Sequence, residues 1–255
     1  MLNTLFGNRV DIAIARFKQF EPPEGYYLAF SGGKDSCVIL DIAKRSGVKF
    51  DAHMNLTVDP PELIQFVRKH HPEVTLHRPE KTMWQLIVEK RVPPDRLKRY
   101  CCPVLKERGG IGRMVATGIT AAESQARKKR NIVELCRNFP GKRFLHPIID
   151  WSVTDVWDYI RMNKIPYCRL YDEEGRTRIG CVMCPNAGPT GMARDAARWP
   201  KIADAYKRAM QRCVDRRIVD GLPTTWKSGQ EMYDWWINGG AKEEDNEDQG
   251  RFFFE

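Results

Sequence analysis

Apolar residues recur along the first 150 residues with two different periods. One helix is predicted over residues 4–20, where Leu5, Val10, Ile12, Ile14 and Phe17 share the helical period and Pro22-Pro23 ends it. Short apolar runs of the strand type follow at 26–30, 50–57, 74–77, 113–119 and 144–148, and helical patterns separate the earlier ones at 37–44, 60–71 and 82–90.

Strands that alternate with helices predict βαβ units. We therefore expect an α/β fold with a doubly wound, mostly parallel five-stranded sheet. Such sheets bind ligands at the carboxyl ends of their strands, where the strand order reverses. Functional side chains are expected directly after strands.

The pattern becomes helical after residue 150. Helices are predicted over 152–163, 200–219 and 228–238, and the stretch 166–189 reads as a loop that carries three cysteines. We expect an α/β domain over 1–150, a C-terminal helical and loop region over 151–240, and a disordered acidic tail over 241–255.

Composition indicates a soluble globular chain. Of its 255 residues 42% are hydrophobic and 29% are charged, with no signal-peptide pattern and no apolar run of membrane-spanning length. A cytoplasmic location without membrane association is expected.

The tail carries two basic and six acidic residues, so the net charge of +9 leaves +13 on the remaining 240 residues. A basic body favours a polyanionic partner, which includes nucleotides, phosphosulfates and nucleic acids, although many proteins this basic bind no nucleic acid.

The segment SGGKDS, residues 31–36, lies where the first predicted strand gives way to a helix. Two glycines let backbone N–H groups form an anion-binding nest, and the helix dipole adds positive potential. Lys34 adds a positive charge, and Asp35 can orient Mg²⁺ or cap the helix. The hydroxyls of Ser31 and Ser36 add donors. The spacing differs from the Walker pattern. A plain tight turn needs neither this setting nor Lys-Asp-Ser, so we predict a phosphate site.

Four of the eight cysteines form two pairs, the adjacent Cys101-Cys102 and the CxxC of Cys181 and Cys184. Four thiolates complete the ligand set of a tetrahedral zinc ion or of a 4Fe–4S cluster. Zinc sites generally use separated knuckles, whereas a cubane spreads its irons apart, so adjacent cysteines favour the cluster. Zinc and a role without metal are the alternatives. We expect the remaining cysteines to pack as small apolar side chains: Cys37, Cys136, Cys168 and Cys213.

The phosphate segment resembles the PP-loop signature SGGxDS of the ATP pyrophosphatases, which split ATP into AMP and pyrophosphate while adenylating a substrate. The resemblance implies a fold like that of the adenine nucleotide alpha hydrolases (the HUP fold), with adenine near Thr57 and Asp59. It implies that ATP, with Mg²⁺, is held through its pyrophosphate by Ser31, Gly32, Gly33, Lys34, Asp35 and Ser36, of which we assign Lys34, Asp35 and Ser36 as catalytic.

The cysteine pattern, CC followed about eighty residues later by CxxC, resembles the cluster motif of the adenylylsulfate and phosphoadenylylsulfate (PAPS) reductase family. GITAAESQAR, residues 118–127, resembles its nucleotide loop, and the segments 146–160 and 165–181 resemble those leading into its CxxC. This likeness to the iron–sulfur branch implies nucleotide contacts from Gly118, Glu123, Ser124 and Arg127, and a 4Fe–4S cluster on Cys101, Cys102, Cys181 and Cys184 near the nucleotide pocket.

Two features depart from the sulfonucleotide reductases of that family. Those enzymes attack sulfur with a cysteine in a C-terminal motif resembling Glu-Cys-Gly-Leu-His, whereas the last cysteine here is Cys213, within the helical basic run 206–217. Their loops also generally depart from SGGxDS, which this chain keeps. Both departures favour activation by ATP over reduction of sulfate.

We therefore expect an ATP pyrophosphatase of the sulfurtransferase type, in which AMP leaves an adenylated acceptor when a sulfur nucleophile attacks. Cluster-bearing enzymes of this kind thiolate tRNA or DNA, which implies a nucleic-acid acceptor and a sulfur donor protein or thiol reductant. The basic run Arg127–Arg130 is a candidate contact for such an acceptor, or else a solvated face. One alternative is a sulfonucleotide reductase that takes its thiol from Cys213 or a partner; another is a non-catalytic nucleotide and redox sensor. A homodimer is compatible with the sequence, which identifies neither the acceptor nor the sulfur donor.

Overall fold

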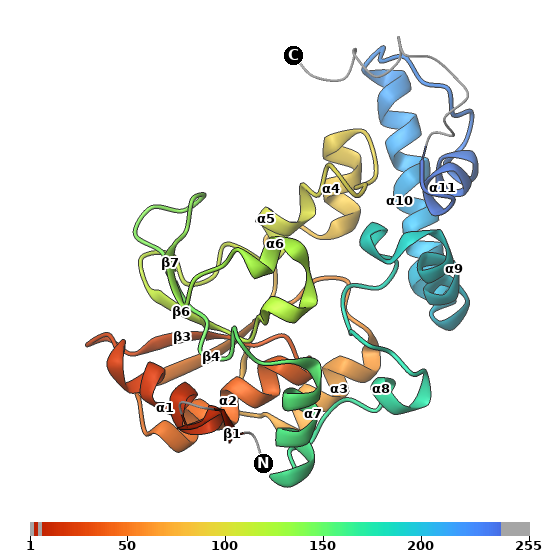
Figure 1. Cartoon of the computed structure of the whole chain (residues 1–255). Coiled ribbons are helices and arrows are strands. Elements are labelled where there is room, and N and C mark those ends of the chain that lie inside the picture. The colour runs from red at the N-terminus through yellow and green to blue at the C-terminus, as the bar shows by residue number, and fades with distance from the viewer. Residues whose placement is uncertain (1–2, 5–6, 241–255) are drawn as a thin grey trace. The chain divides into compact units, whose positions relative to one another are not determined.

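The computed structural model describes residues 3–4 and 7–240 (Figure 1). The expected tail over 241–255 lies outside the described residues. The chain divides into two compact units: the described residues up to Pro79 together with Lys106–Gly180 form unit 1, and Glu80–Leu105 together with the described residues from Cys181 onward form unit 2. This division by contacts differs from a linear one at residue 150, because residues 80–105 pack with helices that come much later in the chain.

The core of unit 1 is a six-stranded sheet in the order β5-β4-β3-β6-β8-β7. Its strands are β3 (Tyr26–Ala29), β4 (Phe50–Asn55), β5 (Thr75–His77), β6 (Met114–Thr117), β7 (Val133–Leu135) and β8 (Arg143–Leu145). All neighbouring strands are parallel except β7 and β8.

The α/β fold with a mostly parallel sheet is confirmed, and each of the five predicted strands is present. The count of five was wrong, because β7 adds an antiparallel edge strand. β7 is only three residues long and follows a run of charged residues, so it has no alternating pattern that could reveal it. The helix predicted over 4–20 begins only at Arg9, since β1 (Asn3–Thr4) and β2 (Gly7–Asn8) form a short antiparallel pair before it.

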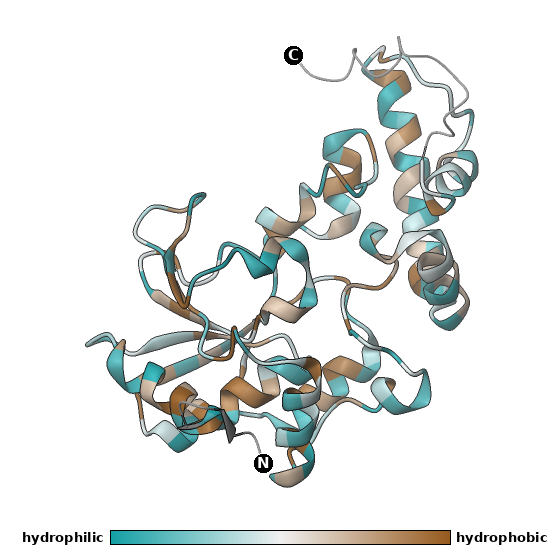
Figure 2. Cartoon of the chain, viewed as in Figure 1, coloured by the Kyte–Doolittle hydropathy of each residue, from teal (hydrophilic) through white to brown (hydrophobic). Residues whose placement is uncertain are grey.

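One face of the sheet is covered by α1 (Arg9–Gln19), α2 (Lys34–Ser46) and α7 (Val153–Met162) (Figure 1). Most of α2 is buried, and Figure 2 colours its apolar residues brown. Tyr26 reaches this layer, where its hydroxyl donates to the carbonyl of Phe17 at 2.8 Å. Unit 1 also contains α3 (Pro61–His70) and the short helices η1 (Ala121–Glu123), α6 (Gln125–Lys128) and α8 (Leu170–Glu173).

The next residue along β3, Tyr27, points to the opposite face, as the period of a strand requires. The loop after residue 106 packs there: a Cβ on Gly109 would lie 2.2 Å from the Tyr27 hydroxyl oxygen, so only glycine fits. Lys142 fastens the same loop, because its Nζ donates to the carbonyls of Glu107 and Gly109 at 2.6 and 2.7 Å.

Unit 2 is helical, with α4 (Met83–Lys90), α5 (Cys101–Leu105), η2 (Pro185–Ala187), α9 (Gly188–Arg198), α10 (Pro200–Val219) and α11 (Gly229–Ile237). α10 packs against both α4 and α11. Tyr206 is at the centre of this packing, with its ring centroid 4.7 Å from that of Trp84 and 4.8 Å from that of Trp236. α9 was not predicted, since the glycines and proline of its first turn are typical of a loop. None of the described helices has both the length and the apolar character that a membrane span requires.

Candidate functional site

The phosphate segment lies at the point where the strand order reverses. The chain passes from β3 to β4 on one side, while β6 lies on the other side of β3, and residues 31–33 follow the carboxyl end of β3. Gly118 directly follows β6, and a Cβ there would lie 2.7 Å from the carbonyl oxygen of Asp35. The loop after β6 and the first turn of α2 therefore approach each other closely through their backbones, at the place where doubly wound sheets bind ligands.

The segment is held in shape by its own backbone and serines. Gly32 has φ +71°, and a Cβ on it would lie 2.7 Å from the side chain of Leu63. Both the left-handed backbone conformation and the lack of space therefore require glycine at this position. The hydroxyl of Ser36 accepts from the amide of Ser31 at 3.2 Å and donates to the carbonyl of Gly33 at 2.7 Å. Gly33 occupies the N-cap of α2 and has no side chain to cap it, so this helix end can accept an anion, although the Lys34 amide already donates to the Tyr171 hydroxyl.

Lys34 and Asp35 form an ion pair at the start of α2. Lys34 is 4% exposed, and its Nζ lies 2.8 Å from Oδ2 of Asp35. A buried ammonium of this kind requires an anionic partner. Its position at the helix end lets it share that charge with a phosphate oxygen, and Asp35, whose two carboxylate oxygens both contact the Lys34 Nζ, is half-buried.

The loop after β6 brings a second set of charges to the same end of the sheet. Arg127 forms an ion pair with Glu123, and its amide donates to Oγ of Ser124 at 3.3 Å. Burial, together with the charge of nearby Arg178, lowers the pKa of Arg127 to about 10, while Asp35 acts in the opposite direction. The Arg127 guanidinium therefore lies near both Arg178 and Asp35, and the two adjacent guanidinium groups favour an anionic ligand.

Thr57 and Asp59 form a local turn after β4. The amide and hydroxyl of Thr57 donate to the two carboxylate oxygens of Asp59 at 2.6 and 2.9 Å. The carboxylate therefore shapes the turn at the sheet edge where the nucleotide was expected.

Two residues of this site were missed by the sequence analysis. Arg178 lies near Arg127, and the hydroxyl of Tyr171 accepts from the amide of Lys34 at 3.0 Å. Both belong to the stretch that reads as a loop, where no periodicity predicts which side chains turn back to the sheet.

A buried histidine was also missed by the sequence analysis. His146 Nδ1 lies 2.7 Å from the hydroxyl of Thr117 at the end of β6, and its Nε2 lies 3.1 Å from Glu134, which also pairs with Arg130. Burial lowers the pKa of His146. This network anchors β7 to the strand that precedes the Gly118 loop.

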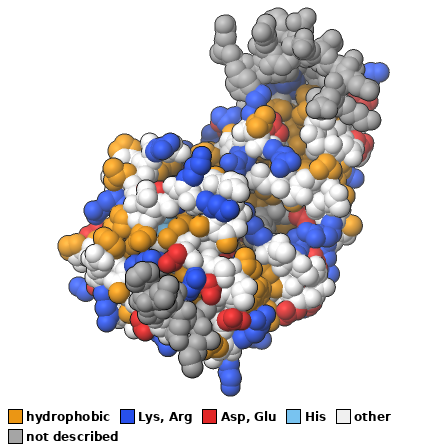
Figure 3. Space-filling view, in the orientation of Figure 1, with side chains coloured by type: hydrophobic (Ala, Val, Ile, Leu, Met, Phe, Trp, Pro, Cys, Tyr) orange, Lys and Arg blue, Asp and Glu red, His pale blue; other side chains and the backbone are white. Residues whose placement is uncertain are grey.

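Ion pairs offset two of the four positive charges in the predicted basic patch at 127–130. Arg127 and Arg130 are paired with Glu123 and Glu134, while Lys128 and Lys129 are exposed. Figure 3 shows Lys and Arg side chains distributed over much of one face, with acidic side chains between them.

The four paired cysteines all belong to unit 2. Cys101 and Cys102 begin α5, and Cys181 and Cys184 precede η2. A hydrogen bond with Cys102 and burial raise the pKa of Cys101, and the charges of Cys181 and Cys184 raise it further, so the four thiols lie within electrostatic reach of one another. Asp195, which is buried, accepts from the amide of Met183 at 2.9 Å and fixes the CxxC turn.

These sulfurs do not converge on one point. Among the residues that the structure describes, no group of three or more His, Cys, Asp or Glu side chains is placed to hold a metal ion. Cys37, Cys168 and Cys213 are buried, which confirms the expectation that they pack as apolar side chains, whereas Cys136 is half-buried.

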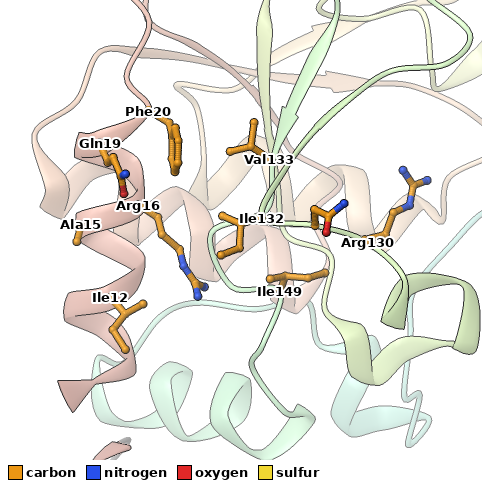
Figure 4. A pocket seen from close by; sticks show the side chains of 10 residues that line it. Ile12, Ala15, Arg16, Gln19, Phe20, Arg130, Ile132, Val133 and Ile149 are labelled. Carbon is orange, nitrogen blue, oxygen red and sulfur yellow. The ribbon is translucent and has the colours of Figure 1, made fainter. Parts of the chain in front are cut away.

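A separate cavity of about 760 Å³ lies between α1 and residues 130–133 (Figure 4). None of its lining residues belongs to the phosphate segment, and aliphatic side chains such as Ile12, Ile132 and Ile149 face it. Arg16 is bound to Asp150 at 2.7 Å, and Arg130 is bound to Glu134. The cavity is therefore a poor site for an anion.

Comparison with known proteins agrees with this architecture. Residues 25–187 match the model of the phosphoadenosine phosphosulfate reductase domain. The chain is 30% identical over 72% of its length to an uncharacterised protein of Methanocaldococcus jannaschii, of which it spans 47%, so it covers about half of that relative. It is 27% identical to an adenosine 5'-phosphosulfate reductase of Oceanobacillus iheyensis, over 67% of this chain and 75% of that one.

The fold is also similar to that of a solved phosphoadenylyl-sulfate reductase from Candida auris, with a TM-score of 0.50 and 21% identity over 68% of this chain and 87% of that one. The strand order, the phosphate segment at its reversal and the match over residues 25–187 lead to one conclusion. The chain belongs to the phosphoadenosine phosphosulfate reductase domain family.

Proposed function

We propose that the protein is an ATP pyrophosphatase that adenylates an acceptor for the incorporation of sulfur. The acceptor oxygen attacks the α-phosphorus of ATP, the bond to the bridging oxygen breaks, and pyrophosphate leaves. A sulfur nucleophile then displaces AMP from the adenylated acceptor. Lys34 and the amides at the start of α2 would stabilise the charge that develops on pyrophosphate.

The observation that carries this proposal is the open end of α2. The N-cap of this helix is a glycine without a side-chain cap, and a buried lysine in the first turn is paired with Asp35. An anion as large as pyrophosphate would accept from the first-turn N–H groups beyond that of Lys34, which donates to Tyr171, and from the lysine ammonium. Mg²⁺ would be held by the phosphate oxygens and by Asp35.

A 4Fe–4S cluster on Cys101, Cys102, Cys181 and Cys184 forms part of the proposal. The residues suit such a group better than a zinc ion, because two of the cysteines are adjacent and a cubane needs ligand sulfurs that are farther apart than those of one tetrahedral ion; Cys101 lies within electrostatic reach of the other three. When bound, the cluster would hold or relay sulfur, or organise the acceptor site. The Asp195 bond to the CxxC turn keeps two of its ligands in place.

A nucleic acid is the proposed acceptor, because the chain outside its acidic tail carries a net charge of +13. The exposed Lys128 and Lys129 follow the Gly118 loop directly and are suited to contact a phosphate backbone.

Sulfonucleotide reduction is the second candidate, and the similarity to an adenosine 5'-phosphosulfate reductase favours it. That chemistry requires a reactive thiolate. Cys213 does not fit this role, since it is buried in α10 and burial raises its pKa to about 11. A reductase of this design would need its thiol from a partner. A non-catalytic sensor, the third candidate, has no need of the Lys34–Asp35 pair.

The test is formation of AMP and pyrophosphate from ATP and Mg²⁺ by anaerobically purified protein, with and without bulk tRNA or DNA. We expect both products to rise with one nucleic acid. Absence of products under every condition, with sulfite release from adenylylsulfate or PAPS and a thiol, would refute adenylation in favour of reduction.

A further inference from the structure

Tyr171 brings a hydroxyl group to the open end of α2. It lies on α8, far along the chain from the phosphate segment, yet its hydroxyl oxygen accepts from the amide of Lys34 at 3.0 Å. The same oxygen would be 3.4 Å from a Cβ on Gly33. The hydroxyl therefore lies beside the backbone N–H donors of the phosphate segment.

The ring of Tyr171 is held firmly, so its hydroxyl has little freedom to move away. The residue is 6% exposed, and the ring lies edge-on to Trp157 with centroids 5.2 Å apart. Tyr167 also packs edge-on against Trp157 at 5.2 Å, and its ring centroid lies 6.4 Å from that of Tyr171. An aromatic cluster of three rings thus fixes the hydroxyl before any ligand arrives.

In its bond with the Lys34 amide, the Tyr171 hydroxyl acts only as an acceptor, so its own proton remains to be donated. Among the described residues this proton has no acceptor. A buried donor that lacks an acceptor is costly, and such groups in a site are commonly completed by a ligand. Burial also raises the pKa of Tyr171, so the group stays protonated and remains a donor at neutral pH.

We propose that Tyr171 is a ligand-binding residue, which donates its hydroxyl proton to a phosphoryl oxygen of a nucleotide polyphosphate bound at residues 31–36. The inference rests on the proposed function, since it assumes a polyphosphate there. It adds a neutral donor from α8 to the charged and backbone donors of the segment, and it makes polyphosphate affinity depend on α8, which precedes Cys181 by only eight residues.

Tyr171→Phe tests this directly, because phenylalanine keeps the ring on Trp157 and removes only the hydroxyl. The matched control is Tyr167→Phe, whose hydroxyl lies 3.4 Å from Asp172 and not at the loop. Dissociation constants of inorganic pyrophosphate, ATP and adenosine are measured by calorimetry with Mg²⁺. We expect Tyr171→Phe to weaken pyrophosphate and ATP about 10- to 100-fold and to leave adenosine unchanged. Tyr167→Phe should match the wild type for all three.

Unchanged or tighter pyrophosphate binding by Tyr171→Phe would overturn the inference, since the hydroxyl would then only occupy the Lys34 amide. If this variant fails to fold, a fluorinated tyrosine at position 171 retains the hydroxyl as a stronger donor and is expected to tighten pyrophosphate binding; no change would again overturn the inference. A wild-type protein that binds neither pyrophosphate nor ATP would refute the proposed function too, and the two failures are thereby distinguishable.

Discussion

The phosphate segment and the four paired cysteines are assembled in opposite ways. The phosphate segment is closed by its own backbone: Ser36 binds Ser31 and Gly33, and glycines admit the close contacts. The cysteines come from two distant stretches, and each thiolate disfavours ionisation of Cys101. A site built from backbone donors is thus formed before its ligand, whereas a site built from like charges needs its ligand to become complete.

Removal of the lysine is expected to have the largest effect. Lys34→Ala should lower ATP turnover about 100-fold or more, because it deletes the buried charge that would stabilise the leaving pyrophosphate in the proposed reaction. Iron content and the visible absorbance of the proposed cluster should stay at the wild-type level. The exposed Lys44, which pairs with Glu73, provides the control Lys44→Ala. Equal turnover in the two variants would contradict a role for Lys34.

Loss of a cysteine should affect the other site alone. Cys181→Ser is expected to lose most of its iron after anaerobic reconstitution, because three ligands hold a cluster poorly. ATP affinity should change less than about 3-fold, since unit 1 builds the phosphate segment without Cys181. Cys136→Ser is the control, as that half-buried cysteine lies outside the two pairs. Full iron content in Cys181→Ser would argue against this ligand assignment.

A smaller steric change sharpens the comparison. Gly118→Ala places a methyl group 2.7 Å from the carbonyl oxygen of Asp35, so the backbone of one loop must shift. We expect ATP affinity to fall about 10-fold and the free energy of unfolding to fall by about 1–3 kcal/mol. Gly180→Ala, where a Cβ meets nothing within 4 Å, should leave both unchanged. Calorimetry and denaturant titration measure the two quantities.

The smallest effect concerns acidity. Burial lowers the pKa of His146 in the folded state, so between that value and its ordinary pKa of about 6.5 the unfolded chain binds more protons. Stability should therefore decrease as the pH falls below about 6.5. Burial acts to raise the pKa of Glu134, but hydrogen bonds from His146 and Arg130 outweigh it and lower that pKa, which extends the loss below about 4.5. The melting temperature should fall by a few degrees from pH 7 to pH 5, at about 2–4 °C per kcal/mol. A slope that is equally steep in His146→Gln would contradict this origin.

The elements that were predictable are those with a regular pattern. The five main strands and the helix Pro200–Val219 follow from apolar periodicity, and the phosphate segment follows from its setting between a strand and a helix. β7 is too short to have a period. Tyr171 reaches Lys34, and Arg178 reaches Arg127, only because α8 and the residues after it fold back, and this depends on contacts between distant parts of the chain. The cysteine pairs were found by counting and spacing, which require no knowledge of their packing.

Residues 80–105 belong to unit 2 but lie in the sequence between the two parts of unit 1, which limits how this chain can be truncated or recombined. These residues interrupt unit 1, and the apolar face of α4, with Met83, Leu86 and Ile87, is covered by α10. The family match ends at residue 187, before α10 begins. A fragment trimmed to that match would expose the α4 face to water and invite aggregation. Chimeras with relatives must therefore exchange residues 80–105 and the C-terminal helices together.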